Sequence, residues 1–158
     1  MEGVTAKVRL ILKKIGIEKP PIDIERIATY FGVHLVPYDN FPENVSGMIA
    51  RDQNVEGESI YVGFNTKHAK VRQRFTIAHE LGHFLSGHDD VKIIEDSFDK
   101  DTIKEREANA FAAELLMPKD MLAVDMKNGS MNIPALAQRY SVSEQAMSIR
   151  LLQSGLIK

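Results

Sequence analysis

Apolar residues at the start of the chain recur every three or four positions, the spacing of one face of an α-helix. They are Val4, Val8, Ile11, Leu12 and Ile15. Gly16 follows, a residue type common at helix ends. A second helix is predicted to begin after Asp23, whose carboxylate can cap it, and to run through Tyr30 to a stop at Gly32.

Short runs rich in β-branched and aromatic residues predict three strands, at residues 33–38, 45–51 and 59–64. Residues 52–58 are polar and include Gly57, so the second and third strands are expected to form a hairpin. The predicted sheet is therefore short and antiparallel.

Helical periodicity returns over residues 67–86, with Gly87 as the stop, and again over residues 102–116, shortly before Pro118. The stretch between them, residues 88–101, is acidic and irregular. Short helices are predicted in the rest of the chain at 119–127, 133–140 and 143–153. The pattern as a whole indicates an α+β fold in which a short antiparallel sheet packs on helices.

Composition narrows the classes of function. The chain has 158 residues, 44% of them hydrophobic, which suits one compact domain with a small appendage. Its net charge of −2 does not indicate a nucleic-acid-binding surface, and the absence of cysteine excludes a zinc site built on thiolates. We recognise neither a signal peptide nor an apolar stretch of membrane-spanning length, and therefore expect a soluble cytoplasmic protein without a membrane partner.

The candidate chemistry lies in the predicted helix at residues 67–86. His79 and His83 are four residues apart, so both imidazoles lie on one face and can share a Zn²⁺ ion. Glu80 lies beside them, where a general base could deprotonate a water molecule activated by zinc. Gly82 would permit close approach of another segment. The alternative is a helix with two coincidental histidines, because so short a pattern also occurs by chance.

A catalytic zinc site needs a third protein ligand. Asp89 follows His83 by six residues, a position that some metallopeptidases use after a glycine turn, but Ser86 stands where that glycine is needed. His88 is one residue out of register, and we expect it at the surface or beside a ligand.

Glu105, in the predicted helix at residues 102–116, is the preferred third ligand. It shares a helical stripe with Ala108 and Ala112, whose small side chains would allow close packing against the histidine helix, whereas Glu107 is better placed for solvent. Asn109, one turn on, could accept a hydrogen bond from the far nitrogen of a ligand histidine. The alternative for Glu105 is an ordinary solvated charge.

Two blocks of this sequence resemble the ImmA/IrrE metallopeptidase family: RFTIAHELGH at residues 74–83 and EREANAFAAELLMP at residues 105–118. The resemblance extends over about residues 20–155. It implies a minimal gluzincin-type fold in which Glu80 is the base. The zinc ligands that it implies are His79, His83 and Glu105. It also implies an intracellular endopeptidase, since several family members cleave Xre-type helix-turn-helix repressors and so release mobile-element or stress-response genes.

An oxyanion stabiliser is a further requirement of peptide hydrolysis. Tyr61, His88 and Arg72 are candidates by residue type, and the sequence does not decide among them. The strand that carries Tyr61 could also bind substrate by strand addition.

Residues 133–153 resemble a helix-turn-helix, with Ser141 at the turn position that often holds glycine. Its expected core is Ala137, Val142, Met147 and Leu151. The second helix offers DNA few basic or amide groups, chiefly Arg150 and Gln145, so an α-hairpin packed on the core or on a partner is favoured over DNA binding. We expect a zincin-like metallopeptidase domain at residues 1–127 and this helical extension at 128–158.

Two functions of different class thus compete. One is an intracellular zinc endopeptidase with an Xre-type repressor as its protein substrate. The other is a non-catalytic protein- or DNA-binding regulatory module, of the toxin–antitoxin or phage-associated kind.

Overall fold

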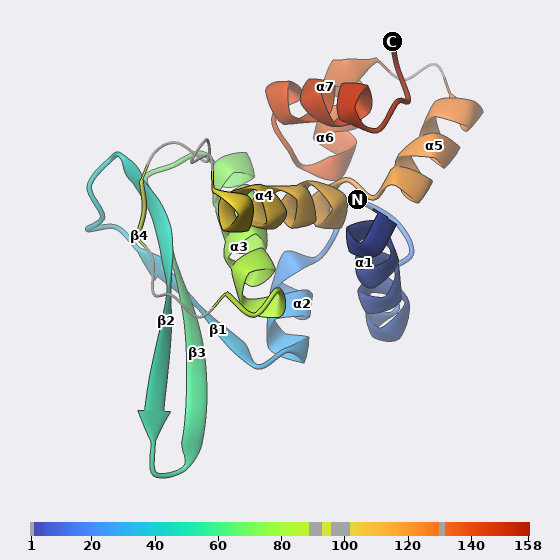
Figure 1. Ribbon diagram of the computed structural model, residues 1–158. Coiled ribbons are helices and arrows are strands. Elements are labelled where there is room, and N and C mark those ends of the chain that lie inside the picture. Colours follow the sequence, from blue (N-terminus) through green and yellow to red (C-terminus); the bar gives the residue numbers. More distant parts are fainter. Residues whose placement is uncertain (1, 89–92, 96–101, 130–131) are drawn as a thin grey trace.

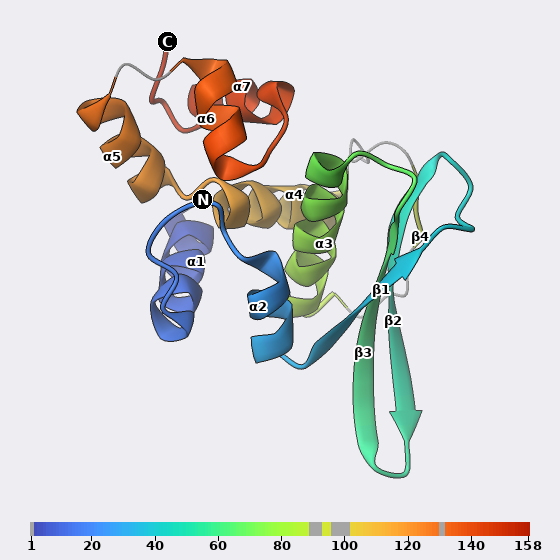
Figure 2. The same cartoon turned by 180° about the vertical axis from the view of Figure 1, so that it is seen from behind.

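The computed structural model describes residues 2–88, 93–95, 102–129 and 132–158. A four-stranded sheet stands to one side of the molecule and the helices pack on the other (Figures 1 and 2). The predicted α+β class is confirmed. None of the helices in the described ranges combines the length and the apolar character needed to cross a bilayer.

The two N-terminal helices form as predicted. Helix α1 (Glu2–Ile15) buries its apolar stripe, and the chain turns at Gly16 with a φ of 80°. Helix α2 (Ile24–Tyr30) is capped by Asp23, whose Oδ1 accepts a hydrogen bond of 3.0 Å from the Arg26 amide. Both therefore follow from local sequence signals.

The sheet contains β1 (Val33–Tyr38), β2 (Val45–Asn54), β3 (Gly57–Asn65) and β4 (Ile93–Glu95), in the order β1-β3-β2-β4. The predicted β2–β3 hairpin is confirmed, but β1 pairs with β3 in parallel, so the prediction of a purely antiparallel sheet is wrong at that edge. The reason is that β3 inserts between β1 and β2, and the connection at residues 39–44 spans the resulting gap. Side-chain alternation reports which face of a strand is buried, not which strand lies beside it.

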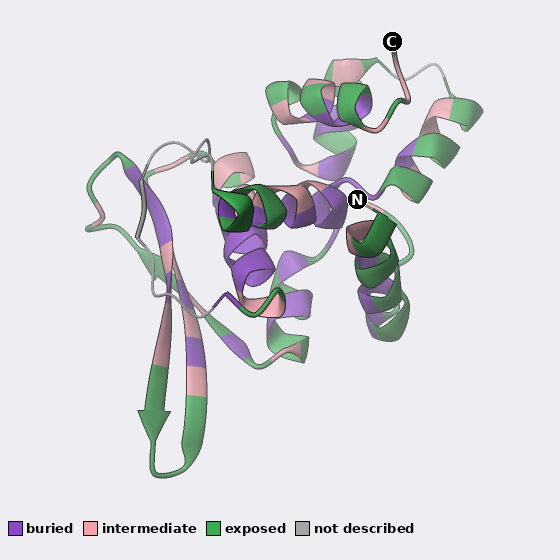
Figure 3. Cartoon of the chain, viewed as in Figure 1, coloured by how far each residue is buried: buried purple, intermediate pink, exposed green. Residues whose placement is uncertain are grey.

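The β2–β3 hairpin extends beyond the helical layer (Figure 1). Strand β1 pairs with β3 only from Ile60 onward, and β4 pairs with β2 only as far as Met48. Within the described residues, the outer half of the hairpin therefore pairs only with itself. Its residues are exposed on both faces, and Val55 at the tip is fully exposed (Figure 3).

Helices α3 (Lys70–Leu85) and α4 (Ile103–Leu116) form the centre of the molecule. Helix α3 begins three residues later than predicted, because the side chains of Asn65 and Gln73 bond to the backbone at Lys67 and His68 and hold a turn there. All residues from 76 to 83 are buried. This continuous burial places the predicted metal ligands inside the protein.

Helices α5 (Lys119–Asn128), α6 (Ile133–Tyr140) and α7 (Glu144–Gln153) complete the chain. The α6–α7 pair has the helix-turn-helix arrangement, and Ser141 occupies the left-handed turn position with a φ of 53°. Its expected core residues are all buried. Arg74 of α3 donates from Nε to the Ser141 carbonyl at 3.1 Å, which ties the turn to the central helices. The division of the chain at residue 127 stays a prediction.

Candidate metal centre

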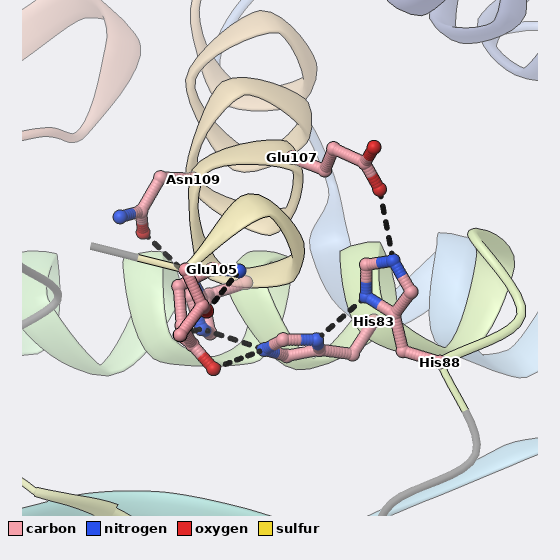
Figure 4. Close-up of polar contacts among 7 residues, drawn as sticks. His83, His88, Glu105, Glu107 and Asn109 are labelled. Atoms are coloured by element: carbon pink, nitrogen blue, oxygen red, sulfur yellow. Dashed lines mark hydrogen bonds and ion pairs between the residues drawn. The ribbon is translucent and has the colours of Figure 1, made fainter. Parts of the chain in front are cut away.

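Three buried side chains from two helices meet at one point. Glu105 Oε2 lies 3.1 Å from His79 Nε2, and Glu105 Oε1 lies 3.2 Å from His83 Nε2. The two Nε2 atoms are 3.1 Å apart. Each side chain is at most 4% exposed, and Figure 4 shows Glu105 of α4 reaching down to the imidazoles of α3. This group could hold a metal ion.

Hydrogen bonds behind each imidazole decide which nitrogen faces that point. Asn109 Oδ1 lies 2.7 Å from His79 Nδ1 and can only accept, so His79 Nδ1 carries a proton. Glu107 Oε2, also an acceptor, lies 2.9 Å from His88 Nε2, which leaves His88 Nδ1 to accept from His83 Nδ1 at 2.9 Å. Both Nε2 atoms therefore present lone pairs.

Three electron-pair donors thus converge at separations of 3.1–3.2 Å. With both imidazoles in the tautomers that these contacts favour, the two nitrogens and the carboxylate would repel one another at this distance, and a cation between them would relieve the repulsion. Tetrahedral zinc, with bonds of 2.0–2.2 Å to nitrogen and oxygen, spaces its ligands by about 3.3 Å. The donor set and its spacing fit zinc.

Close packing of α3 on α4 brings the ligands together. A Cβ atom on Gly82 would lie 3.0 Å from the Ala108 carbonyl oxygen and 3.2 Å from both Ala108 Cα and Phe111 Cβ. Ala108 and Ala112 are both fully buried. Ala108, one of the two small residues expected to allow close approach, therefore lies at the contact. Glu105 is on the inward stripe of α4 as predicted, with 3% exposure.

Glu80, which lies between the two histidines in the sequence, is fully buried. It precedes His83 by three residues, which places it on the adjoining part of the same helical face. Its role as a base stays a prediction, as do the roles of the three ligand side chains.

Comparison with known families agrees with this geometry. The model of the Peptidase_M78 family, described as the IrrE N-terminal-like domain, matches residues 28–152. The chain belongs to this family. The match contains β1 to β3, both metal-site helices, α6 and all of α7 except its last residue. It confirms the family resemblance drawn from the two sequence blocks.

The fold of this IrrE N-terminal-like domain is also found among solved structures. A Mycobacterium tuberculosis transcriptional regulator superimposes with a TM-score of 0.68 over 96% of the chain, at 18% sequence identity. The chain covers 46% of that regulator, so the likeness concerns about half of the larger protein. No curated protein matches the chain.

The other residues that the sequence offered as ligands or oxyanion stabilisers in this family member differ in their surroundings. Asp89 lies outside the described residues. Tyr61 stacks on the imidazole of His34, with ring centroids 5.1 Å apart, and Arg72 donates from Nη2 to Ser46 Oγ at 3.1 Å. His88 lies beside the predicted ligand His83, which is one of the two positions expected for it. Glu107 is exposed as predicted, with 52% of its side chain accessible, but its contact with His88 was not foreseen.

Proposed function

We propose that this protein is a zinc-dependent endopeptidase, with zinc held by His79, His83 and Glu105. The observation that carries the proposal is the convergence of two imidazole lone pairs and one carboxylate at 3.1–3.2 Å. Membership of the Peptidase_M78 family supports the same reaction class. Three protein ligands would leave one coordination position for water or substrate, as catalytic zinc requires.

Zinc, when bound, supplies Lewis-acid polarisation of a water molecule and of the scissile carbonyl. Glu80 would take the proton from the attacking water and pass it to the leaving amine. Its burial on the same helix as the two ligand histidines supports this role, because a general base must lie within reach of the attacking water. Asn109 keeps the His79 ring oriented toward the metal through its 2.7 Å contact with Nδ1.

The proposed substrate is an Xre-type helix-turn-helix repressor in the cytoplasm. The family resemblance supports this choice, as does the shared fold with a protein described as a transcriptional regulator. Hydrolysis of one peptide bond in a repressor would release the genes that it silences.

The test is to incubate the zinc-loaded protein with Xre-type repressors from the same genome and to follow cleavage by mass spectrometry. A single cut is expected with the wild type. Glu80→Gln should abolish the cut, a loss of at least about 10²-fold for a general base, while zinc content stays at one equivalent. Glu56→Ala, at the exposed hairpin tip, is the matched control and should cleave normally.

A non-catalytic module is the outcome that would replace this proposal. It is supported if Glu80→Gln binds zinc and leaves every regulatory output intact. Salt-dependent DNA binding would point the same way. The position of Arg150 is unfavourable for DNA recognition by α7, because this basic side chain is turned inward and bonds to Glu114 and to the Met117 carbonyl.

A further inference from the structure

The turn that ends α3 returns the chain onto the metal site. Ser86 is the C-cap residue and Gly87 adopts a left-handed φ of 71°. The Gly87 amide donates to the Phe84 carbonyl at 3.2 Å, and the His88 amide donates to the His83 carbonyl at 2.9 Å. This pair of bonds is the Schellman motif, in which the second residue past the cap packs against the residue three positions before the cap.

In most such turns that contact is hydrophobic. Here it joins two imidazoles, because His83 lies three positions before the cap residue Ser86 and His88 lies two positions after it. The ring centroids are 5.1 Å apart, and the Nδ1 atoms are 2.9 Å apart. His88 is 8% exposed, so the contact is shielded from water.

Glu107 completes a chain of hydrogen bonds from the surface to the site. Its Oε2 accepts from His88 Nε2 at 2.9 Å (Figure 4). Without this acceptor, His88 could carry its proton on either nitrogen. With it, His88 presents a lone pair to His83 Nδ1, and the lone pair of His83 Nε2 then faces the metal position.

We propose that His88 and Glu107 are positioning residues for the metal site: together they fix the tautomer and ring orientation of His83, and the Gly87 turn delivers His88 to it. The proposal rests on the proposed zinc site and deepens it. It assigns His83 an orienting pair separate from Asn109, which holds His79. The two histidines are thus oriented by different groups. The Asn109 amide on α4 orients His79, and His88, supported by the Glu107 carboxylate, orients His83.

Zinc affinity of the full-length protein, measured by competition with a chromophoric chelator, tests this role without any peptide substrate. His88→Ala should weaken zinc binding about 10- to 100-fold, the range typical of lost support to a ligand histidine. His88→Asn should retain most of the affinity, because an amide oxygen can still accept from His83 Nδ1. Glu107→Ala should weaken binding as well, and Glu56→Ala, another exposed glutamate, should leave it unchanged.

The turn supplies a second matched pair. Gly87→Ala should reduce affinity, since a residue with a Cβ disfavours the left-handed conformation, whereas Gly87→Asn should be better tolerated. Nitrogen-15 correlation spectra of the zinc-free wild type should show His83 protonated at Nδ1, and Glu107→Ala should shift part of that population to the Nε2 tautomer. A merely structural role for His88 would leave the His83 signal the same in both proteins.

Each outcome decides the matter. Coordination of zinc through His83 Nδ1, or a His88→Ala protein that folds and binds zinc within about twofold of wild type, overturns the positioning role. If His88→Ala fails to fold, the exposed Glu107→Ala variant and the tautomer spectrum take its place. A wild type that binds no zinc overturns both proposals. Normal zinc binding with the expected variant losses but without peptide cleavage overturns only the peptidase.

Discussion

Gly82 lies where α3 and α4 approach each other, and Gly82→Ala tests whether this contact sets the geometry of the metal site. The added Cβ would lie 3.0 Å from the Ala108 carbonyl oxygen and 3.2 Å from Ala108 Cα. Both are backbone atoms of a packed helix, so neither can rotate away. The helices must separate by a few tenths of an ångström, which moves Glu105 relative to His79 and His83.

Two opposing terms set the magnitude. Overpacking a buried contact costs about 1–3 kcal/mol, and backbone neighbours place this case in the upper half of the range. Replacing glycine by alanine inside a helix returns about 1 kcal/mol. The expected net loss is about 1–2 kcal/mol, equivalent to a fall in Tm of about 2–8 °C for a protein of this size.

Thermal unfolding of the zinc-free proteins by circular dichroism measures that loss, and chelator competition measures the accompanying fall in zinc affinity. Gly3→Ala is the matched control, because Gly3 also lies in a helix but a Cβ there has no neighbour within 4 Å. This control should stabilise the protein by up to about 1 kcal/mol. A Gly82→Ala protein as stable as the Gly3→Ala variant, with wild-type zinc affinity, would refute the reasoning.

Two further predictions concern the C-terminal helices. Arg150→Met leaves the buried Glu114 carboxylate without its cation and should destabilise the fold by about 3–5 kcal/mol in urea unfolding, while adding Glu114→Gln should restore much of the loss. Burial raises the pKa of Asp125, but hydrogen bonds from Arg139 and Tyr140 and the charge of Arg139 outweigh it and hold that pKa below its ordinary value. A carboxyl group whose pKa is lower in the folded state stabilises that state at pH values above its unfolded pKa. The stabilisation is lost as the pH falls through the folded pKa. The free energy of unfolding should therefore fall less steeply below about pH 4 in Asp125→Asn than in wild type.

The site was predictable because its signals are local. His79 and His83 share a helical face by spacing alone, and the inward position of Glu105 follows from the small residues along its stripe. The Asn109 contact follows from the same stripe, one turn further on. Periodicity within one helix suffices for each of these predictions.

Features that depend on distant partners were not predictable in this way. Arg150 has the sequence position of a DNA-facing residue, yet it is 9% exposed because Glu114, 36 residues earlier, neutralises it. The parallel pairing of β1 likewise depends on where β3 inserts. His88 is an intermediate case: Gly87 was recognised as a helix stop, and a left-handed glycine there already implies that the next residue contacts His83.

The outer half of the β2–β3 hairpin has a consequence for how copies of this protein behave at high concentration. Open strand edges invite pairing with another chain, and proteins commonly prevent it with charged side chains. Asp52, Glu56 and Glu58 lie in or next to this outer half, whose strands pair only with each other among the described residues, and Arg51 bonds to Glu58 across it at 3.0 Å. We therefore expect these acidic groups to oppose self-association. Neutralising them would leave the fully exposed Val55 at the tip of a strand pair able to associate with a second copy.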